Sequence, residues 1–373
     1  MLHHAKVMQA LVHLQDELFI DLSDNIDAAR KAWQQLAADP LFQQKAQAVN
    51  SPWLLPCWEG PVDKVFDVPA MQQAYQVIAV DGSQVYPDRH QGTSCYLVNI
   101  GSVHVRYGSS CGAALTAKPY VFSGRQEHEV QENPIDIVNA KRQELELQTG
   151  LELCKQTFQD RTFPQAFLFD GSLIFWHLAS GGSLLKEYYL SRYLGLMHQL
   201  YQERILHGGY ISLPKSKELV NLIRIQLCNF AIDGCQEQKL VDHIVDATVA
   251  SFFLQPYQRT TVFKSNSPIC QEYPDHLKPY FFYLHVGNEI GRVEVPCWIA
   301  QDAALVDRIA HIMRDQSDKG QGYPVALAES HEQAVVKGPD RDFFYQMINK
   351  MAIEHRRTIA ISQKSARKRR IGV

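Results

Sequence analysis

Two runs of apolar residues that each end in the same turn signal mark two strands of this chain. Val77–Val85 has the sequence VIAVDGSQV and Ala166–Trp176 has the sequence AFLFDGSLIFW, so both runs lead into Asp-Gly-Ser. Apolar runs of four to eight residues closed by turn residues indicate buried strands. A carboxylate at the end of such a strand is costly to bury unless a cation or hydrogen-bond donors meet it. The repeated pattern therefore predicts that Asp81 and Asp170 come together in one sheet.

The neighbouring periodicities predict an alternation of strands and helices. Two β-rich runs, TSCYLVNIG and SVHVRYG, follow the first Asp-Gly-Ser strand with a Gly-Ser turn between them, which favours a three-stranded antiparallel meander. Helices are expected over residues 135–156, where apolar residues recur at near-helical spacing, and over residues 184–205. The order strand, strand, strand, helix, strand, helix, strand predicts an α/β fold with a mixed sheet flanked by helices, which is the ribonuclease H-like plan.

The flanking regions predict further elements and a division into three parts. Residues 1 to about 50 are expected to form two helices, the second interrupted by Asp39-Pro40. After the core order we expect strands at 208–214, 259–265, 279–286 and 292–298 and helices at 216–227, with a Ser216 N-cap, and at 240–254, 302–316 and 324–336. The expected parts are an N-terminal helical extension with a connector (residues 1–70), one α/β domain (residues 71–350) and a basic C-terminal tail (residues 351–373).

Composition indicates a soluble globular protein and excludes a uniformly basic nucleic-acid binder. Of 373 residues, 46% are hydrophobic and 21% are charged, and the formal net charge is −3, although local basic patches remain compatible with it. The eight cysteines are scattered without a CxxC pair, which favours reduced thiols over disulfides or zinc. The N-terminus resembles neither a signal peptide nor a membrane span, and no apolar stretch reaches ~20 residues. The expected compartment is therefore the cytoplasm, without a membrane partner.

The paired acids favour a divalent cation. Two carboxylates a few ångströms apart repel each other unless a cation or a shared proton lies between them. Oxygen ligands suit Mg²⁺ or Mn²⁺ better than zinc, and the glycine after each of Asp81 and Asp170 lets a phosphate or metal approach the backbone. The alternative is ordinary turn chemistry, which a single Asp-Gly-Ser would favour. Because the motif occurs twice, each time behind an apolar strand, a site is the better interpretation.

A third acid is expected from the helix between the two strands. Glu144, Glu146 and Glu152 are available there. On a helical wheel Glu144 falls within the apolar stripe and Glu146 falls outside it, although Leu153 lies beside Glu146 and gives that flank apolar company. Charges at the edge of a helix are usually solvated, so the wheel leaves the choice between the glutamates open.

Six segments in order resemble the NurA nuclease family. They are VIAVDGSQV, KRQELELQTGLEL, FLFDGSLIFW, YISLPKSKELVNLIR, GRVEVPCW and GYPVALAESHEQAVV, which together span residues 75 to about 350. The resemblance implies a ribonuclease H-like core and a Mn²⁺-dependent (or Mg²⁺-dependent) deoxyribonuclease of the 5′–3′ exonuclease and single-strand endonuclease type. It also implies a homodimer that acts in DNA end resection and repair with a HerA-type hexameric ATPase.

The resemblance assigns roles to individual residues. The family's two strand acids match Asp81 and Asp170, and its helix acid matches Glu146 through the ELxxxxEL spacing that begins there. The ELxxxxEL spacing favours Glu146, whereas the helical wheel favours Glu144. We follow the spacing and keep Glu144 as the second choice. A lone His on a helix is more often structural than catalytic, so the role of His331 rests on the resemblance. The implied mechanism is metal-assisted phosphodiester hydrolysis by Asp81, Glu146 and Asp170, in which His331 positions water, ligates a second ion or protonates the leaving group.

Basic residues outside the acidic motifs are candidates for phosphate contacts. They are Lys215 and Lys217 in LPKSKE, Arg292 and the Arg/Lys-rich tail, which includes KSARKRR at 364–370, and for each one solvated surface charge is an equally good interpretation. Tyr86, Tyr96 and Phe175 are aromatic candidates for base stacking, but core packing is the better explanation for them.

Two other classes of protein compete with a nuclease. An actin-like phosphotransferase also pairs Asp-Gly-Ser/Thr hairpins, but the 89 residues from Asp81 to Asp170 (170 − 81) are few for its duplicated domain, and the Gly-Gly adenosine signature is missing. A non-catalytic DNA-binding subunit of a helicase complex needs no buried carboxylates, which the two strands and the helix supply. ATP binding by the isolated protein would favour the first alternative.

Overall fold

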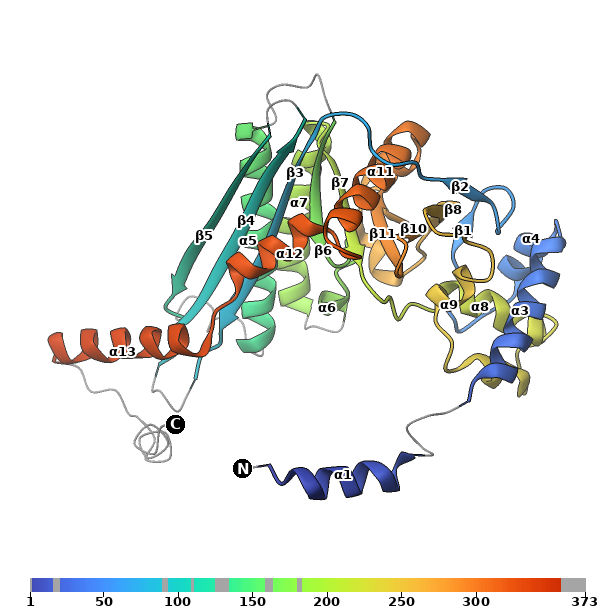
Figure 1. Cartoon of the computed structure of the whole chain (residues 1–373), viewed down its shortest axis with the longest axis horizontal. Coiled ribbons are helices and arrows are strands. Elements are labelled where there is room, and N and C mark those ends of the chain that lie inside the picture. The colour runs from blue at the N-terminus through green and yellow to red at the C-terminus, as the bar shows by residue number, and fades with distance from the viewer. Residues whose placement is uncertain are drawn as a thin grey trace.

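A mixed sheet lies at the centre of the molecule (Figure 1). The computed structural model of the chain describes residues 2–15, 21–88, 93–108, 111–124, 134–157, 164–179 and 183–356. Within these ranges eleven strands form one sheet, in the order β1-β9-β10-β11-β7-β6-β3-β4-β5, with β2 and β8 paired beside β10. The strands β3, β6 and β7 run parallel, and the other pairings are antiparallel.

The elements follow the predicted order through the core. The strands are β1 (Cys57–Trp58), β2 (Val65–Asp67), β3 (Tyr75–Val85), β4 (Tyr96–Tyr107), β5 (Gly112–Phe122), β6 (Gln165–Asp170), β7 (Leu206–Ile211), β8 (Gln258–Thr260), β9 (Phe263–Lys264), β10 (Pro279–His285) and β11 (Ile290–Pro296). The α-helices are α1 (His4–His13), α3 (Ser23–Ala38), α4 (Phe42–Ala48), α5 (Pro134–Thr157), α6 (Trp176–Ala179), α7 (Ser183–Gln202), α8 (Glu218–Leu227), α9 (Asp246–Ala250), α10 (Cys297–Ala300), α11 (Ala303–Lys319), α12 (Val325–Ala334) and α13 (Gly338–Glu354). Three 3₁₀ helices, η2 (Glu237–Val241), η3 (Pro268–Glu272) and η4 (Asp275–Leu277), complete the described elements.

Alternating side chains bury both faces of the central strands. On β3, Ile78 and Val80 join the core beneath α5 and α7, whereas Val77 and Ala79 join the core beneath α11 and α12. This two-sided burial explains the near-continuous apolar runs of the sequence, because helices cover both faces of the sheet. The α/β prediction with a ribonuclease H-like mixed sheet and N-terminal helices is confirmed.

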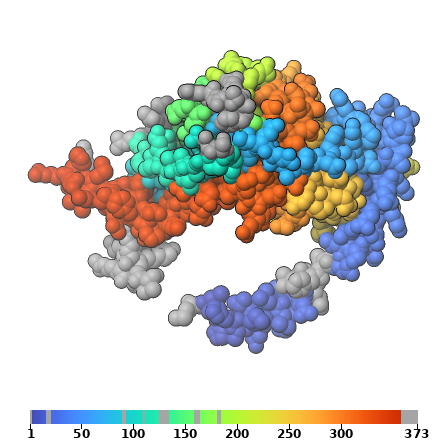
Figure 2. Space-filling model, turned by 45° about the horizontal axis from the view of Figure 1, so that its top comes forward, coloured from blue at the N-terminus to red at the C-terminus, as the bar shows by residue number. Residues whose placement is uncertain are grey.

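The N-terminal region contributes to the sheet as well as covering it. The helices α3 and α4 pack with α8 and α9 at one end of the molecule, where they share a core with β9 and β10 (Figure 1). The connector after α4 supplies the short strands β1 and β2. The helix α1 buries none of its residues, and Figure 2 shows α1 lying apart from the body and α13 extending away from it. None of the described helices combines the length and apolarity that crossing a bilayer requires.

The predicted meander is wrong in its third strand. TSCYLVNIG and SVHVRYG form the single strand β4, and Gly101-Ser102 lies inside that strand instead of forming a turn. The third strand is β5, which the sequence did not predict because its Gly, Ala, Lys and Pro residues have low strand propensity and its apolar residues do not alternate with polar ones. An edge strand with solvated faces needs no alternation of apolar residues.

The two Asp-Gly-Ser motifs also differ from the prediction and from each other. The strand β3 continues through Asp81 to Val85, because β4 pairs with it along its whole length. The strand β6 does end at Asp170, where Gly171 has a φ of +114° and the chain turns away. The second predicted strand is therefore shorter than Ala166–Trp176, and α6 begins at Trp176.

Three local predictions in the later part of the chain are wrong. The helix expected over 240–254 is replaced by η2 and the short helix α9. Ser216 does not cap α8, because the carboxylate of Asp246 accepts hydrogen bonds from the backbone N–H groups of Leu219 and Val220. The structure joins Cys228 to Cys235 in a disulfide, whereas reduced thiols were expected throughout.

Candidate active site

Asp81 and His331 meet on the face of the sheet that α12 covers. Val77, Ala79 and Asp81 alternate along β3 with their side chains toward this face. The imidazole Nδ1 of His331 donates to Oδ2 of Asp81 at 2.8 Å. The Asp81 side chain is only 15% exposed, and that of His331 is 58% exposed. The pair therefore has a sheltered carboxylate and an imidazole that solvent and a substrate can reach.

Gly101 explains how α12 comes close enough for this contact. It lies opposite Asp81 in the register of β3 and β4. A Cβ at this position would stand 2.3 Å from the carbonyl oxygen of Ser330 and 2.4 Å from the backbone nitrogen of Ala334. The helix crosses the strand where there is no side chain. The C-terminal end of α12 is also held by Asn99, whose amide donates to the Ala334 carbonyl at 2.9 Å.

The serines of the two Asp-Gly-Ser motifs serve as anchors. The Ser83 hydroxyl accepts from the backbone N–H of Val336 at 3.3 Å, just after α12 ends. The Ser172 hydroxyl donates to Oε2 of Glu294 on β11 at 2.7 Å, and the same oxygen accepts from the Leu173 N–H at 2.8 Å. Each serine thus fixes a segment next to one of the two predicted acids.

Glu146 approaches Asp81 from the opposite face of the sheet. It lies on α5, above Gly82, where an added Cβ would stand 2.6 Å from Oε1 of Glu146. Burial raises the pKa of Glu146 to about 8; Arg142 opposes this rise, and the negative charges of Asp81 and Asp170 add to it. The Oε1 atom is buried and lies 3.4 Å from Nε of Arg142, and a hydrogen bond from the Gly82 backbone also lowers the pKa of Glu146. A buried carboxylate in this state favours a cation.

Asp170 completes the group at the end of β6. Val80 pairs with Phe169 in the parallel register, so Asp81 and Asp170 each follow directly after the last paired residues of β3 and β6. Burial raises the pKa of Asp170, a hydrogen bond from Tyr323 opposes this shift, and the charge of Asp81 adds to it. The register of β3 and β6 therefore places Asp81 and Asp170 at neighbouring positions, as the sequence predicts.

Glu144 lies outside this acidic group, at the contact between α5 and α7. Its carboxylate is buried and pairs with Lys141 at 2.7 Å and with Arg192 on α7. The wheel was right that Glu144 faces the protein interior, but that interior is the contact between α5 and α7. The structure places Glu146, and not Glu144, beside Asp81 and Asp170.

Sequence reasoning missed Tyr323 and Arg142 at this site. The Tyr323 hydroxyl hydrogen-bonds to Asp170, and burial together with Asp170 raises the pKa of Tyr323. Arg142 donates from Nη1 to the Gly82 carbonyl at 3.2 Å and is the cation nearest to Glu146. The spacing of Arg142 four residues before Glu146 was the available signal, since residues at i and i+4 share a helix face.

The residues suit a hard divalent cation by their chemistry. Three carboxylates from β3, α5 and β6, those of Asp81, Glu146 and Asp170, offer only oxygen ligands. Within the described ranges no three His, Cys, Asp or Glu side chains form a ready-made metal cage. Side-chain rotation of Asp81, Glu146 and Asp170 would accompany binding.

The structure describes three of the predicted phosphate contacts, and they differ in how accessible they are. Lys215 is exposed in the loop after β7, and Lys217 donates from Nζ to the Asp242 carbonyl at 2.6 Å. Arg292 is buried, and it pairs with Glu218 on α8 at 2.5 Å and with Glu294 at 2.8 Å. A cation enclosed by two carboxylates cannot present itself to a phosphate at the surface, so the structure speaks against Arg292 as a direct contact. The basic segment at 364–370 lies outside the described residues.

The aromatic candidates are structural. Tyr96 and Phe175 are buried in the core beneath α5 and α7. The Tyr86 hydroxyl donates to the side-chain amide oxygen of Asn139 at 2.7 Å and packs against the same core. Core packing was the better explanation for these three side chains.

The fold and the acidic group define a ribonuclease H-like α/β protein with a carboxylate site at adjoining strands. The chain belongs to the NurA family, since residues 75–336 match the NurA domain. Its fold is similar to that of the crystal structure of the NurA nuclease from Sulfolobus solfataricus, with a TM-score of 0.53 and 15% identity over 95% of this chain and 98% of that one.

Two more distant structural matches were found. A crystal structure of NurA has a TM-score of 0.34 at 12% identity over 76% of this chain and 90% of that one. A crystal structure of NurA bound to dAMP and manganese has a TM-score of 0.33 at 11% identity over 90% of this chain and 94% of that one. No curated protein sequence matches this chain.

Proposed function

We propose that this protein is a divalent-metal-dependent deoxyribonuclease that hydrolyses phosphodiester bonds in DNA end resection and repair. The observation that carries the proposal is the grouping of Asp81, Glu146 and Asp170 from β3, α5 and β6, with His331 against Asp81. Family membership favours this chemistry over an actin-like phosphotransferase and over a non-catalytic DNA-binding subunit.

Asp81, Glu146 and Asp170 would hold Mn²⁺ or Mg²⁺. When bound, such an ion supplies a Lewis acid for the phosphate and lowers the pKa of water. Binding requires ionised ligands and would therefore act against burial, which raises the pKa of Glu146. Arg142 and the Tyr323 hydroxyl hold the glutamate and Asp170 in place by an ion pair and a hydrogen bond.

His331 moves a proton in this proposal. An ionised carboxylate only accepts hydrogen bonds, so Nδ1 carries the proton in the contact with Asp81. The second ring nitrogen, Nε2, is then free to accept a proton from the attacking water or, when charged, to donate one to the leaving oxygen. The high exposure of the imidazole allows this exchange with a bound strand.

The polarity of digestion, the strand preference and the partners proposed here rest on the resemblance to the NurA family. We propose 5′–3′ exonuclease and single-strand endonuclease activity, a HerA-type hexameric ATPase as partner, and a homodimer. Phe343, Met347 and Met351 are exposed along one side of α13, and this apolar stripe supports an interface with a second copy. In domain terms, residues 71–350 form the nuclease domain, residues 1–70 the extension with its connector and residues 351–373 the basic tail.

Digestion of end-labelled DNA tests the proposal. Single strands labelled at the 5′ or the 3′ end are incubated with the full chain and Mn²⁺, Mg²⁺ or a chelator. Early release of the 5′ label with Mn²⁺ or Mg²⁺, and intact DNA with the chelator, is the expected result. Intact DNA under all conditions, or cutting that persists with the chelator, would refute the proposed function.

A further inference from the structure

A pocket opens at the turn that follows Asp170 in the chain. Its volume is about 470 Å³, within the roughly 300–1,000 Å³ of small-molecule sites. Gly171 and Ser172, the two residues after Asp170, form part of its wall, and the loop from β7 to α8 forms another part. The pocket therefore lies at the carboxyl ends of β6 and β7, and two of its lining residues directly follow Asp170 in the chain.

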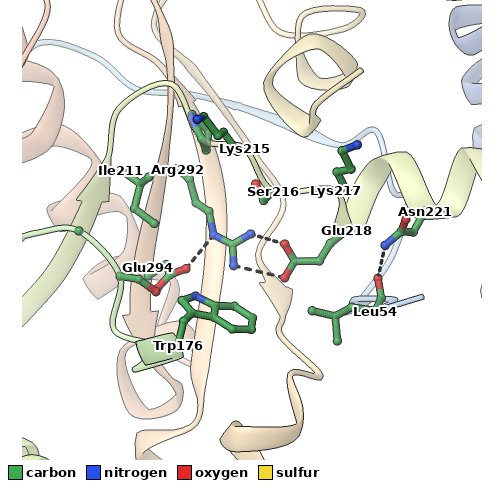
Figure 3. Close-up of a pocket in the computed structure, with 13 residues that line it drawn as sticks. Leu54, Trp176, Ile211, Lys215, Ser216, Lys217, Glu218, Asn221, Arg292 and Glu294 are labelled. Carbon is green, nitrogen blue, oxygen red and sulfur yellow. Dashed lines mark hydrogen bonds and ion pairs between the residues drawn. The ribbon is translucent and has the colours of Figure 1, made fainter. Parts of the chain in front are cut away.

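The pocket combines an exposed aromatic ring with an exposed lysine. The Trp176 side chain is 45% exposed at the start of α6, whereas the adjacent Phe175 is 2% exposed. Lys215 is exposed on the loop after β7. Figure 3 shows Trp176 on one side of the Arg292–Glu218 pair and Lys215 on the other. A large aromatic ring left in solvent within a pocket is better explained by a ligand than by packing.

The floor between these side chains is fixed in advance. Arg292 pairs with Glu218 and Glu294, and Glu294 in turn holds Ser172 and the Leu173 N–H. Glu218, Glu294, the Ser172 hydroxyl and the Leu173 N–H are all hydrogen-bonded in this network. The floor of the pocket is therefore rigid and polar. Because these groups are paired with one another, the floor fixes the shape of the pocket and does not itself bind the ligand.

The loop that carries Lys215 is strained. Leu213 has a φ of +44°, a region that favours glycine, and its side chain is 73% exposed. Strained backbone of this kind persists where the surrounding structure requires it, and it concentrates at ligand sites. Lys215, two residues after Leu213 in this loop, lines the pocket.

We propose that this pocket receives one unpaired nucleotide of the DNA strand next to the phosphodiester bond at the carboxylate site. Its base stacks on the Trp176 indole, and the phosphate beside it contacts Lys215. Both faces of a base in a duplex are covered by its neighbours, so only an unpaired or frayed nucleotide can stack in this way. The inference rests on the proposed nuclease function.

Binding of a labelled oligothymidine to the Asp81→Asn protein tests the inference without cleavage. Adding Trp176→Ala to this protein is expected to weaken binding roughly 5- to 150-fold, the range for loss of one base stacked on an aromatic ring. Trp176→Phe keeps an aromatic face and should bind within about threefold of the parent. Tyr188→Ala removes an exposed aromatic ring of α7 outside the pocket and serves as the matched control with unchanged binding.

Photochemical cross-linking locates the base directly. The Asp81→Asn protein is bound to oligonucleotides that carry one 5-iododeoxyuridine, irradiated and digested for peptide mass spectrometry. A cross-link at Trp176 is expected from an unpaired position and not from a position within a blunt duplex. Equal binding by Trp176→Ala, or cross-links only outside the pocket, would overturn the inference. The wild-type digestion reports separately on the nuclease function, since failure there is an absence of metal-dependent cutting.

Discussion

Nδ1 of His331 lies 2.8 Å from Oδ2 of Asp81, although 250 residues separate them in the chain. Two features of the sheet create this contact. Asp81 lies inside β3 on the face that α12 crosses, and Gly101 on β4 leaves room for the helix at that point. The carboxylate both orients the imidazole and belongs to the proposed metal ligands, so the two functions of the site share one side chain.

Replacing His331 tests its proposed role in proton transfer. We expect His331→Ala to lower kcat about 10²- to 10⁴-fold, the usual range for a general acid or base. The exposed side chain contributes little to the core, so the thermal midpoint should change little. Glu332→Ala, the next exposed position on α12, is the matched control with unchanged kcat. A His331→Ala protein with full activity would remove this residue from the mechanism.

The two glutamates of α5 should separate function from stability. Glu146→Gln removes a proposed metal ligand and is expected to abolish Mn²⁺-dependent cleavage. Glu144→Gln leaves Arg192 and Lys141 without their buried partner and should lower the free energy of unfolding by about 1–3 kcal/mol while activity persists. Denaturant unfolding and DNA digestion measure the two effects. The reverse ranking in the digestion assay would show that Glu144 is the metal ligand.

A methyl group at Gly101 should displace α12. The Cβ of Gly101→Ala would meet backbone atoms of Ser330 and Ala334 at 2.3 and 2.4 Å, which neither partner can avoid by changing rotamer. We expect a loss of about 1–3 kcal/mol in stability, as for overpacking in a core, and a fall in kcat because His331 moves away from Asp81. Gly112→Ala is the control on β5, since its nearest neighbour would lie at 3.6 Å. Equal stability and kcat in both variants would contradict this account of α12.

Replacing Arg292 should lower stability, whereas replacing Lys215 should weaken DNA binding. Arg292→Gln leaves Glu218 and Glu294 buried without their cation, and we expect a loss of about 3–5 kcal/mol in the free energy of unfolding. Lys215→Ala should leave stability unchanged, weaken DNA binding and reduce the slope of log K against log[salt] by about 1. Chemical denaturation and salt titrations of DNA binding check both. A stable Arg292→Gln protein with weakened DNA binding would restore Arg292 as a phosphate contact.

The apolar pattern predicted the central elements because both faces of the sheet are buried. The runs around Val77–Val85 and Phe167–Phe169 are apolar on both sides, and this signal is local. The edge strand β5 was not predicted, since its sequence is rich in residues of low strand propensity and its apolar residues show no alternation with polar ones. Gly101-Ser102 has the sequence of a turn, but the chain continues straight there because β4 pairs with β3 on one side and with β5 on the other.

The two strand acids of the site could be predicted from the sequence, but the residues that contact them could not. The repeated Asp-Gly-Ser motif pointed to Asp81 and Asp170 from local sequence alone. The choice between Glu144 and Glu146 depends on whether α7 or β3 faces each residue, which a helical wheel does not contain. Tyr323 reaches Asp170 from a segment about 150 residues later, and such a contact has no signature in the order of residues.

Titration of Mn²⁺ followed by electron paramagnetic resonance of the free aqueous ion tests the carboxylate site most directly. The wild-type chain should remove Mn²⁺ from the free pool, and a folded protein with both Asp81→Asn and Asp170→Asn should leave the free signal as in buffer. Equal uptake of Mn²⁺ by the two proteins would contradict the claim that these acids hold the ion.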